Sequence, residues 1–435
     1  MNPFRTLPGF LIILFALALA TQIFAASAPN SRLGEVHFPI SCSAAVQNRF
    51  NTAVALLHSF QYNEAEQAFS GVAEQDPHCA MAYWGKAMSL YHQLWDFPNA
   101  VKLKEGREDL RKAEELGAKT ARERGYIAAA AAFYQDDPSL SPDARTEAYS
   151  KAMDTLHQQD PGDVNAAAFY ALSLVALAQD GIVNIANRRH AIAILQPLFA
   201  AHPENPGIDH YLIHASDDPR LARFGLAAAR NYARIAPDSA HALHMPSHIF
   251  TRLGYWQDSI QSNLASAAAA EEATRSGRDN EWGHQLHALT FLEYANLQSG
   301  QDAAARNVIE EVTRIPGTSA KELEEDQLLL RATYFIETHQ WKQAAALKLL
   351  PGDGFPRDQW QVSWTRTIGA ARSGNASQAR LGFQKLRQAG SFLVAKAKNS
   401  GYNSAGIETA QLEAEAWLEY AEGRHDEAMR TMRKA

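Results

Sequence analysis

From Ser43 onward, apolar residues recur at the three- and four-residue spacing of an α-helix, and alanine is frequent throughout. Runs in which apolar and polar residues alternate, as they do in a half-buried strand, are rare in the same stretch. The pattern therefore predicts an all-α protein.

A repeat with fixed offsets divides this helical sequence into hairpins. Phe60 is followed by Tyr62, Ala65, Phe69 and Pro77, which matches the second half of the tetratricopeptide pattern. The offsets of two, five and nine residues recur after five further turn positions, namely Gly254, Gly300, His339, Gly374 and Gly423. Glycine lets the chain turn between helices A and B, and the small residue at offset five lets these helices approach closely.

Between Phe60 and Gly254 the repeat is looser, but further turns can be placed near Pro161, Pro203 and Pro237. We therefore expect a tetratricopeptide-like α-solenoid of about eight helical hairpins. In the last repeat the closing proline would fall beyond Ala435, so we expect this domain to be truncated at its C-terminus. The alternative is that the final helix itself caps the repeat.

The first 26 or so residues have the pattern of a secretory signal peptide. Arg5 precedes an apolar run, and small residues follow from Ala25 to Ala28. We expect cleavage, better placed after Ala25 than after Ala28, and a helical-repeat domain of residues 27–435 that is periplasmic or secreted. An uncleaved anchor is the alternative, although the apolar run is short for a membrane span. No membrane span is expected after cleavage.

Charge and cysteine content narrow the choice of partners and compartment. The chain has 41 basic and 48 acidic residues and no basic run, which argues against nucleic acid as a partner. Its two cysteines, Cys42 and Cys79, are an even number in a chain with an export signal, so we expect one disulfide. The alternative is two unpaired buried cysteines.

The most unusual feature is a concentration of histidine. Seven of the 16 histidines lie in one segment at helical spacings, namely His210, His214, His241, His244, His248, His284 and His287. Residues three, four or seven apart share a face of a helix. The repeat places the three groups on the A helices of three successive hairpins, which line the concave face of a tetratricopeptide array.

Imidazole is the commonest protein ligand of zinc and copper, so these groups predict a site for Zn or Cu. Counting back from the hairpin turns, we expect a main site near His210, His214, His244 and His248, and a second near His241, His284 and His287. Pro246 should kink or restart the helix between His244 and His248. Supporting candidates are Asp209, Asp217 and Glu281, which could orient ring nitrogens, and Met245, which could bind Cu(I).

Two other interpretations of the histidines remain open. They could be half-polar core residues bonded to backbone carbonyls, or they could line a site for an organic or anionic ligand. The chain has no His-Glu-x-x-His motif, no P-loop and no glycine-rich phosphate cradle, so no catalytic residue is assigned.

Three phrases of the sequence resemble a family of exported bacterial tetratricopeptide-repeat proteins: DPHCAMAYWG from Asp76, HYLIH from His210 and HALHMPSHIFTRLGYW from His241. The resemblance covers essentially the whole mature chain and implies a helical-repeat fold and export. Family members continue beyond the equivalent of Ala435, and the resemblance carries no established activity. Two functions follow: a metal-binding protein for delivery, sensing or oxidative chemistry, or a scaffold whose groove binds a peptide or partner protein while the histidines only pack.

Overall fold

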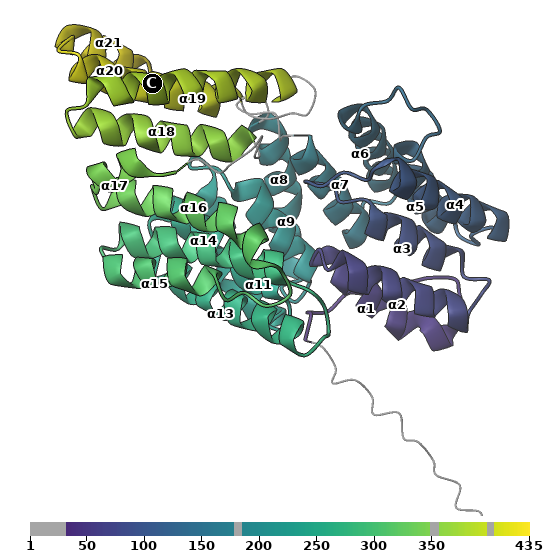
Figure 1. The fold of residues 1–435 in the computed structure, drawn as a ribbon. Coiled ribbons are helices and arrows are strands. Elements are labelled where there is room, and N and C mark those ends of the chain that lie inside the picture. Colours follow the sequence, from purple (N-terminus) through teal and green to yellow (C-terminus); the bar gives the residue numbers. More distant parts are fainter. Residues whose placement is uncertain (1–31, 178–184, 349–355, 398–403) are drawn as a thin grey trace, which may run out of the picture. The chain divides into compact units, whose positions relative to one another are not determined.

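The computed structural model describes residues 32–177, 185–348, 356–397 and 404–435, and every regular element in these residues is a helix (Figure 1). The predicted all-α fold is confirmed. The predicted signal segment lies outside the described residues. Within the described ranges, none of the helices is long and apolar enough to cross a membrane.

Successive helices pack against each other as hairpins. The first five hairpins, preceded by a 3-10 turn at Ala44–Val46, are α1 (Gln47–His58) with α2 (Tyr62–Gln75), α3 (Ala80–Leu90) with α4 (Ala100–Leu116), α5 (Ala121–Phe133) with α6 (Pro142–Gln159), α7 (Val164–Ala176) with α8 (Ile185–Ala201), and α9 (Pro206–Ser216) with α10 (Ala222–Ile235).

The sixth hairpin has a broken A helix. It pairs α11 (Ala240–His244) and α12 (Pro246–Leu253) with α13 (Trp256–Arg275). The remaining hairpins are α14 (Trp282–Gln298) with α15 (Asp302–Val312), α16 (Ala320–Glu337) with α17 (Trp341–Ala346), α18 (Pro356–Arg372) with α19 (Ala376–Ala397), and α20 (Ser404–Ala421) with α21 (His425–Lys434).

The described residues thus form ten hairpins, whereas about eight were expected. The difference arises in the N-terminal half. The α3–α4 and α5–α6 hairpins turn through residues 91–99 and 134–141, which contain no glycine and do not follow the repeat. A pattern built on short turns could not detect them.

The six turns that the repeat did predict share one backbone geometry. Each turn residue has a left-handed φ, namely 56° at Phe60 and His339, 73° at Gly254, 74° at Gly300, 78° at Gly374 and 82° at Gly423. Helix B begins two residues after the turn residue in every case. The small residue at offset five is buried in all six hairpins, as close packing of helices A and B requires.

The first hairpin also contacts α9, which is distant from it in sequence. Gly207 permits this close approach, because a Cβ at that position would lie 2.4 Å from Nδ1 of His58. The hydroxyl of Tyr211 lies 2.8 Å from the same nitrogen. This contact places the turn at His58–Phe60 against the histidines of α9.

Cys42 and Cys79 form the predicted disulfide, with their Cα atoms 5.0 Å apart. Cys79 is buried at the residue before α3, so the bond ties the segment in front of α1 to the start of the second hairpin. The two cysteines are 37 residues apart, and a crosslink over such a loop restricts the unfolded chain.

We predict that replacing both Cys42 and Cys79 by serine lowers the free energy of unfolding by about 2–4 kcal/mol, because the unfolded chain regains the entropy of the open loop. Urea unfolding followed by circular dichroism measures this difference. The matched control is wild-type protein under reducing conditions, in which a thiol titration shows that both cysteines are free. An unfolding free energy that is unchanged in both samples would contradict the prediction.

Candidate metal centre

The seven histidines lie on the A helices of three successive hairpins, as the sequence predicted. Asn205 caps α9 by accepting hydrogen bonds from the N–H groups of Gly207 and Ile208, and Pro206 occupies its first turn. Ser239 caps α11 in the same way. Helix α11 ends at His244 and α12 begins at Pro246, so the predicted restart at this proline is confirmed.

His210, His214 and His241, which we name the first histidine cluster, point their Nε2 atoms at one another. Nε2 of His210 lies 2.9 Å from Nε2 of His241 and 3.0 Å from Nε2 of His214. All three side chains are buried. The three nitrogens therefore converge on one small volume between α9 and α11.

His244, His248 and His287 form the second histidine cluster. Nε2 of His244 lies 2.9 Å from Nε2 of His248, and the ring of His287 is centred 4.5 Å from that of His244. One ring nitrogen from each of the three residues lies within 4.8 Å of the others. His244 is buried, His248 is half-buried and His287 is exposed, so this cluster is the more open of the two.

The two clusters adjoin each other. The ring of His214 is centred 6.5 Å from that of His248. His284 lies next to the first cluster, with its ring 5.5 Å from that of His241. All seven predicted histidines thus belong to one continuous group.

The grouping within this set differs from the expected one. His241 joins His210 and His214, and His287 joins His244 and His248. The expected grouping counted the depth of each histidine from the hairpin turn. This count misplaced His241 and His287 because the A helices differ in length, with 11 residues in α9 and 17 in α14. Counted from the helix starts, His244 and His287 lie at nearly the same depth.

Three of the rings are fixed through Nδ1, the nitrogen on the far side from the cluster. Nδ1 of His210 lies 2.6 Å from the backbone carbonyl oxygen of His58. Nδ1 of His244 lies 2.7 Å from Oδ1 of Asn263, and Nδ1 of His248 lies 2.9 Å from Oδ2 of Asp217. A ring that donates from Nδ1 to oxygen keeps a lone pair on Nε2 when it is neutral, which is the state that binds a metal ion.

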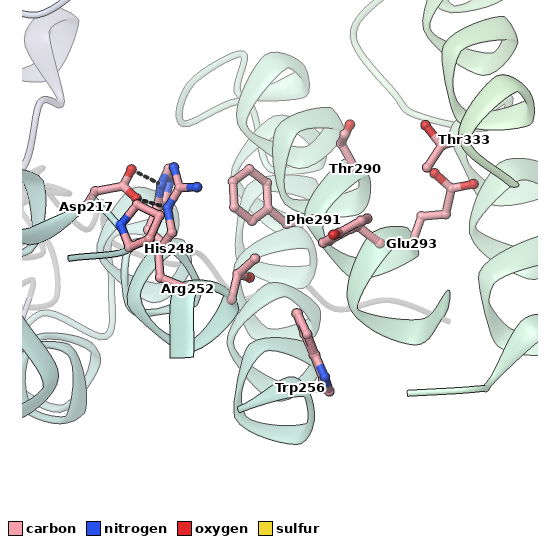
Figure 2. A pocket seen from close by; sticks show the side chains of 11 residues that line it. Asp217, His248, Arg252, Trp256, Thr290, Phe291, Glu293 and Thr333 are labelled. Carbon is pink, nitrogen blue, oxygen red and sulfur yellow. Dashed lines mark hydrogen bonds and ion pairs between the residues drawn. The ribbon is translucent and has the colours of Figure 1, made fainter. Parts of the chain in front are cut away.

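Burial keeps most of these imidazoles neutral. It lowers the pKa of His210 to about 3, and it holds the pKa values of His214, His241 and His244 well below the usual value of 6.5. Burial opposes the charge of Asp217, but the hydrogen bond from His248 and the nearby Arg252 outweigh it and lower the pKa of this carboxyl. Asp217 is therefore an ionised acceptor for Nδ1 of His248 (Figure 2).

Aromatic side chains cover the first cluster. The ring of Phe60 is centred 4.3 Å from that of His210 and 5.6 Å from those of His214 and His241. Trp95, on the connection between α3 and α4, lies 5.8 Å from His214. Phe60 has a left-handed φ, which strains the backbone of a bulky residue. Such strain often occurs at functional sites.

The four supporting candidates lie in different surroundings. Asp217 accepts from His248, whereas Asp209 accepts a 2.7 Å bond from Nδ2 of Asn231, and burial raises its pKa to about 8. Met245 lies in the buried apolar core. One carboxyl oxygen of Glu281 lies within 4.8 Å of one from Glu64 and one from Asp279.

Sequence reasoning missed three residues of this centre. Asn263, which holds His244, occupies the offset-nine position after Gly254, where the repeat calls for a bulky side chain, so its polarity was a usable signal. His58 contributes only its backbone carbonyl, and Phe60 was recognised as a turn residue alone. Neither role leaves a trace in the sequence, because both depend on the contact between the first hairpin and α9.

No protein-family profile matches the chain, and no curated protein matches it significantly. Among solved structures it is similar to the tetratricopeptide-repeat domain of P58(IPK), with 13% sequence identity over 87% of this chain and 99% of that chain and a TM-score of 0.23. A TM-score of this size is too low to support an inference. The evidence for a tetratricopeptide-like fold is therefore the series of hairpins and the shared geometry of their turns.

The buried imidazole of His58 predicts a loss of stability in acid. Burial lowers its pKa to about 4 from 6.5, so between these pH values the unfolded chain binds a proton that the folded protein does not. The free energy of unfolding therefore falls as the pH falls. The contribution of His58 amounts to about 2 kcal/mol between pH 6.5 and 5, at 1.36 kcal/mol per pH unit.

Comparison with the His58→Asn variant isolates this contribution from those of other titrating groups. With EDTA present, urea unfolding at pH 6.5 and pH 5 should show that wild type loses about 2 kcal/mol more stability than the variant. Equal losses in the two proteins would show that His58 titrates normally in the folded state.

Proposed function

We propose that this protein binds transition metal ions, zinc or copper, at the first and second histidine clusters of a tetratricopeptide-like helical repeat. The observation that carries the proposal is the separation of 2.9 Å between Nε2 of His244 and Nε2 of His248. Both rings have Nδ1 on an oxygen acceptor, so in their neutral forms both Nε2 atoms carry lone pairs. Two lone pairs at this distance repel each other, and a cation bound between them removes the repulsion.

Asn263 supports this assignment of the protons. Its Nδ2 donates a 2.8 Å bond to the carbonyl oxygen of Ser259, which leaves Oδ1 as the atom that faces His244. Nδ1 of His244 must then be the donor. Asp217 has no proton to give His248, since its pKa is lowered.

Distance and donor type favour zinc or copper. A tetrahedral ion with bonds of about 2.0–2.1 Å holds its nitrogen ligands about 3.3 Å apart. The nitrogens of the first cluster are 2.9 and 3.0 Å apart, so small ring rotations would accommodate an ion. Imidazole suits zinc and copper, whereas magnesium and calcium require oxygen ligands. Three ligands per cluster leave a fourth position for water or another ligand.

The surroundings give the two clusters different properties. Phe60 and Trp95 cover the buried first cluster, which favours a retained ion. The second cluster includes the exposed His287 and adjoins a cavity, which favours an ion that exchanges with solvent. Exchange at one site beside a retained ion suits metal delivery or sensing.

We propose that this protein acts outside the cytoplasm. The Cys42–Cys79 disulfide supports an oxidising compartment, and the residues before position 27 have the sequence of a signal peptide. A periplasmic or secreted protein with metal-binding imidazoles would meet its ions after export.

Metal content tests the proposal directly. Protein purified without a polyhistidine tag and reconstituted with Zn²⁺ or Cu²⁺ should hold about two ions per chain by elemental analysis. His210→Ala should remove the ion of the first cluster and His248→Ala that of the second. His202→Ala is the matched control, because His202 is exposed and lies outside both clusters.

The alternative function is a scaffold that binds a peptide or partner protein, with histidines that only pack. Less than about 0.2 equivalents of either metal after reconstitution, in protein with the helical circular dichroism of the fold, would overturn the metal proposal and leave the scaffold. If a partner protein still crosslinks in the periplasm when His210 and His248 are replaced by alanine, this result would further favour the scaffold.

A second prediction concerns Asp217, which holds His248 through Nδ1. Asp217→Asn should weaken zinc binding at the second cluster by about 10–100-fold, because the ring loses its charged acceptor, and leave the first cluster unchanged. Competition with a zinc chelator measures both affinities. Asp218→Asn is the matched control, since Asp218 pairs with Arg220 instead. Equal effects of the two variants would contradict the role of Asp217.

A further inference from the structure

A cavity of about 550 Å³ lies beside the second histidine cluster. His248 and Asp217 form one end of it, and side chains of α14 and α16, including Glu293 and Thr333, form another part (Figure 2). This volume lies within the range of about 300–1,000 Å³ that is typical of small-molecule sites. The cavity can therefore hold a ligand larger than water.

Aromatic side chains form much of its wall. Phe291 lies between His248 and Glu293 in Figure 2, with its ring centred 4.7 Å from that of His248. Trp256 and Tyr294 lie edge to face, with ring centroids 6.1 Å apart. Such walls favour a flat apolar ring, which can stack on one aromatic face and meet the edge of another.

The charged groups of the cavity are compensated within the protein. Nε of Arg252 donates a 2.8 Å bond to Oδ1 of Asp217, whose other oxygen accepts from His248. Burial, aided by the negative charge of Glu337, raises the pKa of Glu293 to about 9, so this carboxyl is protonated at neutral pH. No charge is left for an ionic ligand to neutralise, and an uncharged ligand fits better.

Glu293 contributes a buried polar atom to the lining of this cavity. The residue is 1% exposed, and its Oε1 is buried without a hydrogen bond to any described residue. A buried polar atom that is left unpaired is unfavourable, whereas a carboxylic acid can both donate to and accept from a hydroxyl group. The orphaned oxygen points to a ligand that brings such a group.

We propose that this cavity binds a small uncharged aromatic molecule with a hydroxyl group, its ring among Trp256, Phe291 and Tyr294 and its hydroxyl bonded to Glu293. This site goes beyond metal binding and does not require it. His248 nevertheless lines the same cavity. A ligand in this position would adjoin the open side of the second histidine cluster.

Phenol and toluene, which differ by the hydroxyl group, are the probes. Binding is measured by ligand-observed NMR, in EDTA-treated and in zinc-loaded protein. Wild type should bind phenol about tenfold more tightly than toluene in both samples, as a hydrogen bond to a buried group predicts. Glu293→Leu should abolish this preference and retain toluene binding, whereas Glu293→Gln should keep much of it.

Glu310→Leu, an exposed change on α15, is the matched control and should behave as wild type. Thermal unfolding of each variant establishes that it is folded, and the Glu293→Gln variant tests the hydrogen bond if the leucine variant does not fold. Equal affinities for phenol and toluene in wild type, or no binding of either, would overturn the proposal. Because EDTA-treated protein is included, a failure of metal binding would leave this result unaffected.

Discussion

The hydrogen bonds at Nδ1 of three histidines determine what this centre can do. The carbonyl oxygen of His58, the amide oxygen of Asn263 and the carboxylate of Asp217 each occupy the outer nitrogen of a ring. Each ring is thereby oriented, and its lone pair is directed at the neighbouring histidines. Without these acceptors the rings could exchange protons among themselves and satisfy their nitrogens within a packed core. With them, the neutral forms of His244 and His248 hold two Nε2 lone pairs 2.9 Å apart, an arrangement that a bound cation would stabilise.

The fold provides these acceptors from separate hairpins. Gly207 lets α9 approach α1, which brings the carbonyl oxygen of His58 to His210 and the ring of Phe60 over the first cluster. Phe60 has the left-handed backbone conformation that glycine has at four of the equivalent turns. The contacts of its ring must therefore compensate for the strain of its backbone. Both clusters are built from histidine, but the first is buried and the second adjoins a cavity.

Much of this arrangement could be predicted from sequence. The repeat located six turns, the first residue of six B helices and the three A helices that carry the histidines, because these features depend on local spacing. The grouping of His241 and His287 could not be predicted, since it depends on the relative stagger of helices that differ in length. The contacts of His58 and Phe60 with α9 join residues about 150 positions apart, and no local pattern records them. Glu293 likewise looks like an ordinary helical glutamate until its burial is known.

We expect the two histidine clusters to bind ions and not merely to pack against one another. An anomalous difference map at the zinc absorption edge, from crystals of zinc-loaded protein, distinguishes these two arrangements. We expect two peaks, one about 2.0–2.1 Å from Nε2 of His210, His214 and His241 and the other at the same distance from ring nitrogens of His244, His248 and His287. A map without a peak between these rings, with their Nε2 atoms in direct contact, would contradict it.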